Sequence, residues 1–171
     1  LTDVDRPRRG LRDPFASRWP ALRDVPWFPA VGDGAAANVG SGCVTPQRVA
    51  LTVGTTSALR VVVEGTPDEV SAGLWCYRVD RHRSLLRGAL SEGGNVYAWM
   101  RRALRLDDPA AVEDALAALD PDAHGLTVLP FWAGERSPGW AGKARAVIQG
   151  LSLATDPIDV LRAGLEAVAY R

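Results

Sequence analysis

Lysine is almost absent from this sequence: Lys143 is the only one, and arginine supplies the remaining positive charge. Basic and acidic residues number 20 each, so the formal net charge is zero. The basic residues are scattered, without the clustering that nucleic acid or an anionic membrane surface requires. We therefore expect neither of these partners.

Cysteine is nearly as scarce. Cys43 and Cys76 lie far apart, show no C-x-x-C spacing and have only His82 and His124 as further candidate ligands. Two such cysteines make no disulfide framework and argue against a structural zinc site. We assign no residue to a metal site.

Long apolar runs are missing as well, and no segment has the character of a signal peptide or a membrane span. The default expectation is a cytoplasmic protein. The composition that is present, 47% hydrophobic and 23% charged residues, is ordinary for a globular protein. A chain of 171 residues is long enough for one domain that buries roughly 70% of its unfolded surface.

Glycine and small hydroxyl residues gather between residues 32 and 57. Asp33 follows the apolar run 25–31, which predicts a short buried strand, and precedes residues 35–37, which predict a helix start. The carboxylate would then lie at the carboxyl end of a strand, where open α/β sheets bind ligands. Gly32 and Gly34 would let a ligand approach the backbone, and a helix start offers N–H groups to an anion.

A second loop, residues 54–57, follows a predicted strand over residues 49–53. Gly54, Thr55 and Thr56 suit a turn that binds an anion through N–H groups and hydroxyls, and they suit a tight hairpin turn equally well. Asp33 likewise has two readings, as a helix N-cap or as a general base. On the residues alone, both alternatives stay open.

Several stretches taken together resemble a known family. Residues 32–42 and 50–57 look like the centre of the FGGY carbohydrate kinases, and they are most similar to the gluconokinase-like and xylulokinase-like members. Residues 88–94, 134–140 and 146–167 match in the same order, so the resemblance runs over almost the whole chain. One departure is Gly164, where the family usually has a small residue with a Cβ.

The resemblance implies an ATP-dependent enzyme that phosphorylates a hydroxyl of a sugar or sugar acid, of the gluconate or pentulose type. Asp33 would be the catalytic base and, with Gly32, would contact the substrate. Gly54, Thr55 and Thr56 would hold the β- and γ-phosphates of ATP, with Mg²⁺ as the accompanying cation. A homodimer of the full-length protein is left open. The chain has no G-x-x-x-x-G-K-[ST] motif, which excludes a Walker-type kinase.

The resemblance also implies an α/β fold of the actin-like ATPase type, which is ribonuclease H-like, present here in part. The pattern along the chain agrees with it. Four short segments rich in Val, Leu, Tyr and Trp predict a meander of adjacent strands, and helices and strands then alternate. The predicted strands are 49–53, 58–64, 74–80, 85–91, 126–132 and 146–151, and the predicted helices are 95–106, 109–119 and 157–170.

We expect a domain boundary near Cys43. Residues 1–43 would end an N-terminal, sugar-binding domain, and residues 44–171 would begin a C-terminal, nucleotide-binding domain. Because the chain starts without methionine and stops in an apolar helix, we also expect it to be an internal piece of a longer protein and inactive by itself.

The sequence also allows two alternatives to a kinase to be compared. The same fold could serve as a non-catalytic binding or regulatory module. Hydrolase chemistry fails, because Ser41 lacks the glycine two residues earlier that a nucleophile elbow requires. Outside the main site we expect a structural ion pair to hold the loop that contains Glu135 and Arg136, with direct ligand contact as the less favoured alternative. Glu92, followed by Gly93 and Gly94, has two readings that stay open, as a helix N-terminus lining the cleft or as a plain helix start. We expect Trp99 to serve core or loop packing.

Overall fold

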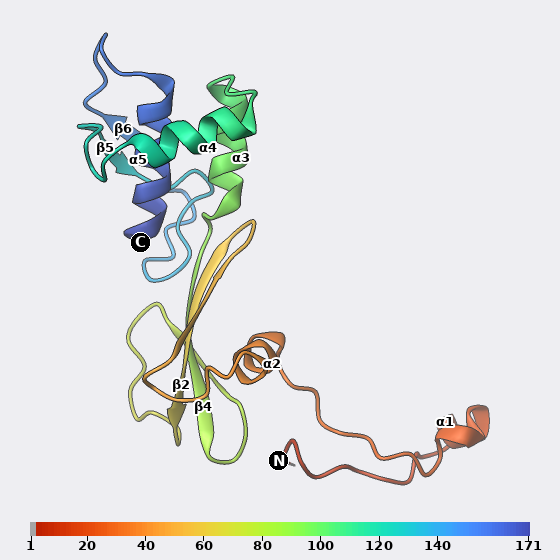
Figure 1. The fold of residues 1–171 in the computed structure, drawn as a ribbon. Helices are drawn as coiled ribbons and strands as arrows, with labels where there is room; N and C mark the ends of the chain where they lie inside the picture. Colours follow the sequence, from red (N-terminus) through yellow and green to blue (C-terminus); the bar gives the residue numbers. More distant parts are fainter. Residues whose placement is uncertain (1–2) are drawn as a thin grey trace. The chain divides into compact units, whose positions relative to one another are not determined.

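The computed structural model describes residues 3–171, and Figure 1 shows the chain as a ribbon. The chain divides into two compact units. The first comprises the residues up to Ala50 together with Arg60–Val70 and Trp75–Leu86, and the second comprises Leu51–Leu59, Ser71–Leu74 and Arg87–Arg171. None of the helices among the described residues has the length and apolarity needed to cross a bilayer.

The four predicted strand segments form one sheet. They are β1 (Val49–Val53), β2 (Ser57–Glu64), β3 (Trp75–Arg78) and β4 (Arg83–Leu90). The strand order is β1-β2-β4-β3, which differs from the sequential order of a meander. The connection over residues 65–74 is too long for a tight hairpin. Instead Gly65 N–H donates to the His82 carbonyl at 2.6 Å, so the end of β2 lies beside the start of β4.

Helix α2 (Asp33–Gly40) belongs to the first unit, and the predicted helix start is confirmed. Its Ala35 is buried with Val62, Val79 and Leu85, and Tyr77 packs against this small core. The helix begins close to the sheet: a Cβ on Gly34 would overlap the Tyr77 hydroxyl. The absence of a side chain at Gly34 therefore allows close packing against Tyr77, whatever ligand binds beside Asp33.

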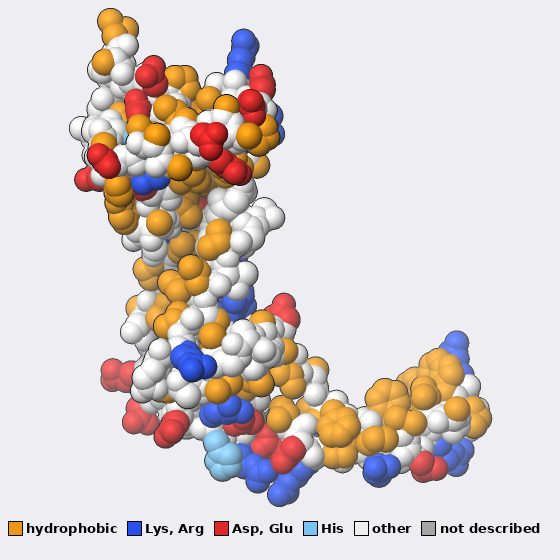
Figure 2. Space-filling view, viewed as in Figure 1, with side chains coloured by type: hydrophobic (Ala, Val, Ile, Leu, Met, Phe, Trp, Pro, Cys, Tyr) orange, Lys and Arg blue, Asp and Glu red, His pale blue; other side chains and the backbone are white. Residues whose placement is uncertain are grey.

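The predicted buried strand over residues 25–31 is wrong. Within residues 3–171, Trp27 alone of this segment pairs, through an isolated antiparallel bridge to Arg8, and Trp27 and Phe28 are 44% and 59% exposed. Two prolines in the segment have no N–H to donate to a ladder. The segment is preceded by α1 (Phe15–Arg18) and the 3₁₀ helix η1 (Pro20–Leu22), and hydrophobic side chains lie on the surface around α1 (Figure 2).

The second unit holds three helices and a short antiparallel pair of strands. The helices are α3 (Gly94–Ala103), α4 (Pro109–Ala118) and α5 (Pro157–Ala169), and the strands are β5 (Thr127–Leu129) and β6 (Val147–Gln149). All five were predicted, although both strands are shorter than expected. Helix α5 contacts α3, α4 and β5, so it is the central element of this unit (Figure 1).

The core of the second unit forms where these helices meet. Val96 and Met100 of α3, Val112 of α4 and Leu161 of α5 are buried together. Residues four apart lie on one helix face, which explains why Val96 and Met100 both point inward. Partly buried residues complete the cluster, including Leu116, Trp132, Ile148 and Ile158.

Candidate functional site

The turn between β1 and β2 carries three of the predicted site residues. Gly54, Thr55 and Thr56 are all exposed, and Gly54 N–H donates to the Thr56 carbonyl at 2.9 Å. The φ of Gly54 does not lie in the left-handed region. A Cβ added there would meet only the Thr56 carbonyl oxygen, at 3.9 Å. The bare side of Gly54 is therefore open to a ligand.

The start of α3 lies directly against this turn. Gly94 N–H donates to the Gly54 carbonyl at 2.7 Å, and Asn95 N–H donates to the Thr55 carbonyl at 3.2 Å. A Cβ on Gly93 would lie 2.8 Å from the Gly54 carbonyl oxygen, and one on Gly94 would lie 3.0 Å from it. Only glycine permits this approach at Gly93, because real Cβ atoms do not come so near a carbonyl oxygen.

This packing occupies the N–H groups at the start of α3. The N–H groups of Gly94 and Asn95 are donated to the turn, and Val96 N–H donates to the Asn95 side chain at 2.8 Å. The free N–H groups of a helix start are what would attract an anion. Because these groups are already hydrogen-bonded, α3 supports the β1–β2 turn, and an anion would be held by the turn itself.

A pocket of about 490 Å³ adjoins the turn. One wall is a single face of α3, with residues spaced three and four apart. Trp99 is 43% exposed on this wall, and its ring lies 6.1 Å from that of Trp132. Among residues 3–171 no carboxylate forms an ion pair with Arg102, so the wall carries a positive charge. The pocket is lined by Gly54, Thr55, Gly94, Asn95, Ala98, Trp99 and Arg102.

Sequence reasoning missed this wall, since it assigned Trp99 to core or loop packing and gave Asn95 and Arg102 no role. The signal available was the spacing of Asn95, Trp99 and Arg102, which puts their side chains on one face of a helix. That spacing alone does not reveal that the face borders a turn far back in the sequence. The pocket itself, at about 490 Å³, has a volume in the range typical of small-molecule sites.

Asp33 is the first residue of α2 and is exposed. Its Oδ1 accepts the N–H of Gly34 at 2.6 Å. The N-cap residue of α2 is Gly32. The alternative that Asp33 is the N-cap is therefore wrong. Gly32 and Asp33 belong to the first unit, whereas Gly54, Thr55 and Thr56 belong to the second.

The loop of residues 133–142 is held by an ion pair, as expected, and the partner of Glu135 is Arg171. Arg171 Nη2 lies 2.8 Å from Glu135 Oε1 and also donates to the Ser137 carbonyl at 3.1 Å. The same guanidinium lies 4.9 Å from the centre of the Phe131 ring. Glu135 therefore joins the loop to the end of α5.

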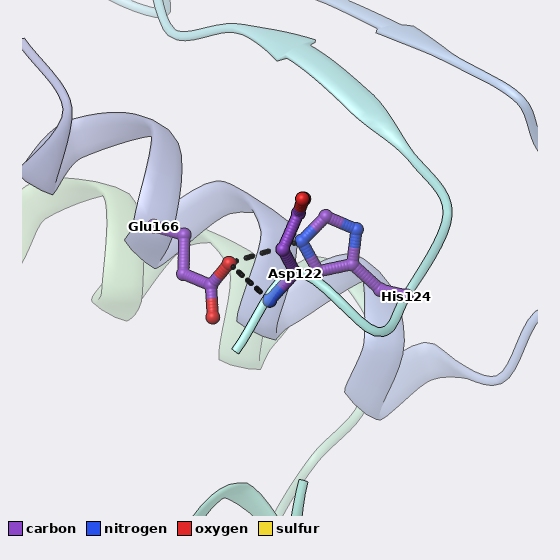
Figure 3. A group of neighbouring side chains, drawn as sticks. All are labelled: Asp122, His124 and Glu166. Carbon is purple, nitrogen blue, oxygen red and sulfur yellow. Dashed lines mark hydrogen bonds and ion pairs between the residues drawn. The ribbon is translucent and has the colours of Figure 1, made fainter. Parts of the chain in front are cut away.

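Asp122, His124 and Glu166 are the one group of three candidate metal ligands among the described residues (Figure 3). Both ring nitrogens of His124 are already in use: Nδ1 accepts Leu126 N–H at 3.0 Å, and Nε2 lies 3.2 Å from Glu166 Oε2. Glu166 also accepts Asp122 N–H at 3.0 Å and pairs with Arg162. A cation would have to break these bonds beside a guanidinium, so the cluster acts as a structural link.

Comparison with known proteins identifies what this arrangement is similar to. The sequence model of the "FGGY family of carbohydrate kinases, C-terminal domain" matches residues 49–171. The gluconokinase of Bacillus subtilis is 28% identical over 158 residues, covering 86% of this chain and 31% of the relative. The glycerol kinase of Rhodospirillum centenum is 33% identical over 165 residues, covering 93% of this chain and 33% of the relative.

A solved structure gives the same result for the fold. The ligand-bound xylulose kinase from Lactobacillus acidophilus superimposes with a TM-score of 0.83 at 25% sequence identity. The match covers 99% of this chain and 35% of that protein. The chain thus spans about a third of the length of the relatives that it matches.

Proposed function

The chain belongs to the FGGY family of carbohydrate kinases, and from this premise we propose that the protein transfers the γ-phosphoryl group of ATP to a hydroxyl of a sugar or sugar acid. The actin-like ATPase fold is confirmed by the structural match. The observation that carries the proposal is the β1–β2 turn, which is open on the Gly54 side and adjoins a pocket of about 490 Å³.

Gly54, Thr55 and Thr56 are proposed to hold the β- and γ-phosphates. Phosphoryl transfer requires close positioning and charge stabilisation more than covalent chemistry from the protein. An exposed turn with a bare glycine lets phosphate oxygens approach the backbone, and the hydroxyls of Thr55 and Thr56 add donors. Mg²⁺ bound with ATP would neutralise charge on the phosphates, and we assign it no ligand from this chain.

Asp33 is proposed as the general base, and Gly32 and Asp33 as contacts of the acceptor. The Asp33 carboxylate is exposed, and Oδ1 is oriented by Gly34 N–H. A carboxylate that accepts the hydroxyl proton during attack contributes roughly 10²–10⁴-fold to the rate. The family match, which begins at residue 49, supports a division into an N-terminal part up to Cys43 and a C-terminal part from Val44. A homodimer of the intact protein stays a prediction.

The test is an assay of the intact protein with ATP and Mg²⁺ against a panel of polyols, pentuloses and sugar acids. ADP release that depends on one acceptor, with a phosphorylated product seen by mass spectrometry, is the expected result. Titration calorimetry with ATP separates the alternatives. ATP binding without product on any acceptor would favour a binding or regulatory module, and absence of ATP binding would contradict the proposal.

A further inference from the structure

Glu92 is a buried carboxylate that the proposed chemistry does not use. It lies between β4 and α3 and is only 2% exposed. Burying a carboxylate is costly unless hydrogen bonds or charges compensate. Burial raises the pKa of Glu92; the Ala133 N–H, its own backbone N–H and the Arg171 charge act against this rise, and the Glu135 charge adds to it. The fold therefore keeps the Glu92 carboxylate buried at a cost in free energy.

The side chain of Glu92 connects two segments. Oε1 accepts the N–H of Ala133 at 3.2 Å, at the beginning of the 133–142 loop. That loop is fixed from other sides, since Ser137 N–H donates to the Ala89 carbonyl at 2.9 Å and Glu135 pairs with Arg171. Glu92 is therefore attached to a loop that is itself anchored to β4 and to the end of α5.

The two residues that follow Glu92 are packed closely against the β1–β2 turn. Gly93 and Gly94 lie so close to the β1–β2 turn that a Cβ on either would come within 2.8 to 3.0 Å of the Gly54 carbonyl oxygen. Gly94 N–H is bonded to that same carbonyl at 2.7 Å. Because packed protein transmits small displacements, a shift of Glu92 would reach Gly54 through two residues.

We propose that Glu92 is a positioning residue for the turn of Gly54, Thr55 and Thr56: its bond to Ala133 fixes Gly93 and Gly94, and these fix the turn. This inference rests on the proposed function, because it assigns the turn to ATP phosphates. Glu92 is buried and is not among the residues that line the pocket beside the turn. It acts through the hydrogen bonds that Gly94 and Asn95 donate to the turn.

The experiment compares Glu92→Ala with Glu92→Gln in the intact protein, with Glu113→Gln, an exposed position on α4, as the control. Loss of the carboxylate in Glu92→Ala should raise the KM for ATP roughly tenfold, because small misplacements of binding groups are costly. The KM for the acceptor should stay within about twofold. Glu92→Gln keeps an oxygen that accepts Ala133 N–H and should restore the KM for ATP to within about threefold.

A readout that does not depend on activity is hydrogen exchange at Gly94 and Asn95, whose N–H groups are bonded to the turn. Exchange there should accelerate in Glu92→Ala and not in Glu92→Gln or Glu113→Gln. Unchanged exchange would overturn the inference even if ATP binding is normal. If exchange accelerates but the wild-type protein does not bind ATP, the proposed function fails and the positioning of the turn stands.

A second pair of variants keeps the inference testable if Glu92→Ala does not fold. Gly93→Ala places a Cβ 2.8 Å from the Gly54 carbonyl oxygen, whereas Gly142→Ala places one in open space. Gly93→Ala should raise the KM for ATP at least as much as Glu92→Ala, and Gly142→Ala should leave it unchanged. Equal rises in the KM of both substrates, together with a lower melting temperature, would reduce Glu92 to a stabilising residue and overturn the inference.

Discussion

Asp33 and Gly54 carry the proposed chemistry for opposite reasons. Asp33 contributes a carboxylate that is exposed at the start of α2 and oriented by Gly34 N–H. Gly54 contributes the absence of a side chain, which leaves one side of its backbone open. A change at Asp33 should therefore alter the chemical step, and a change at Gly54 should alter the binding of ATP.

Asp33→Asn should lower turnover of the intact protein by about 10²-fold or more, because an amide accepts no proton from the acceptor hydroxyl. Its oxygen can still accept Gly34 N–H, so the start of α2 should be preserved. ATP affinity should remain nearly unchanged in calorimetry. Asp68→Asn, at an exposed position, is the control. Turnover of Asp33→Asn within a few-fold of wild type would contradict the role of Asp33.

Gly54→Ala should weaken ATP binding more than acceptor binding. The backbone of Gly54 is not in the left-handed region, so an alanine there meets no backbone strain. The added methyl group meets no protein atom closer than 3.9 Å, so stability should change little and the effect should isolate a clash with phosphate. Calorimetry with each ligand measures it, and equal losses for both ligands would indicate a folding defect instead.

Helix α5 packs against α3, α4 and β5 of the second unit. Its Glu166 also holds the 119–126 loop through hydrogen bonds with Asp122 and His124. At Gly164, Met100 of α3 occupies the space that a Cβ would need, with Sδ and Cε both 2.5 Å from the Cβ position.

Gly164→Ala should destabilise the intact protein by about 1 kcal/mol, because overpacking against buried Met100 exceeds the gain in helix propensity. Combining it with Met100→Leu, which removes the clashing end of the side chain, should recover most of that loss. Denaturant titration of the two single variants and the double variant gives the coupling. If the changes in unfolding free energy of the two single variants simply add in the double variant, Gly164 and Met100 do not compete for space.

Glu166 provides a prediction about pH. Burial by itself would raise its pKa, but hydrogen bonds from Arg162, Asp122 N–H and His124 outweigh burial and lower it. A lowered folded pKa means that the carboxylate stabilises the fold above its unfolded pKa of about 4.3, and that this contribution is lost as pH falls through the folded value.

Glu166→Gln should therefore reduce the free energy of unfolding by about 1–3 kcal/mol at pH 7, and the difference from wild type should shrink below about pH 4. Urea titrations at several pH values measure it, with Glu113→Gln as the exposed control on α4. A difference that stays constant down to the lowest pH would show that ionisation of Glu166 adds nothing.

At the scale of the whole molecule, apolar side chains lie uncovered on the segment around α1 and the 25–31 run (Figure 2). Phe15 is 54% exposed and Phe28 is 59% exposed. Large exposed apolar patches mark surfaces that associate. The chain spans about a third of the length of the relatives that it matches.

The isolated 171-residue chain should self-associate and should release no ADP in the presence of any sugar or sugar acid, because the proposed reaction needs the acceptor held by Asp33 to be aligned with the phosphates held by the β1–β2 turn while water is excluded. Light scattering after gel filtration measures association, which Phe28→Ser should reduce. Sugar-dependent ADP release that Asp33→Asn abolishes would instead show a complete enzyme.

Much of the molecule follows from the sequence alone. Helices α3 to α5, the start of α2 and the six strands were predicted within a few residues, because apolar periodicity and turn residues act locally. The family was identified because its stretches recur in order. The 25–31 run shows the limit of local reasoning: its apolar residues read as a buried strand, although two prolines and the lack of a neighbouring strand leave it exposed.

The tertiary structure decided the strand order and the partners of individual groups. Placing β4 between β2 and β3 depends on pairing between distant segments, which no local pattern encodes. The pairing of Glu135 with Arg171, and the pocket wall formed by α3, depend on which segments meet. For Glu92 the sequence left open a cleft-lining helix N-terminus and a plain helix start. Its burial, and the close approach of Gly93 and Gly94 to the Gly54 carbonyl, arise only when those segments pack together.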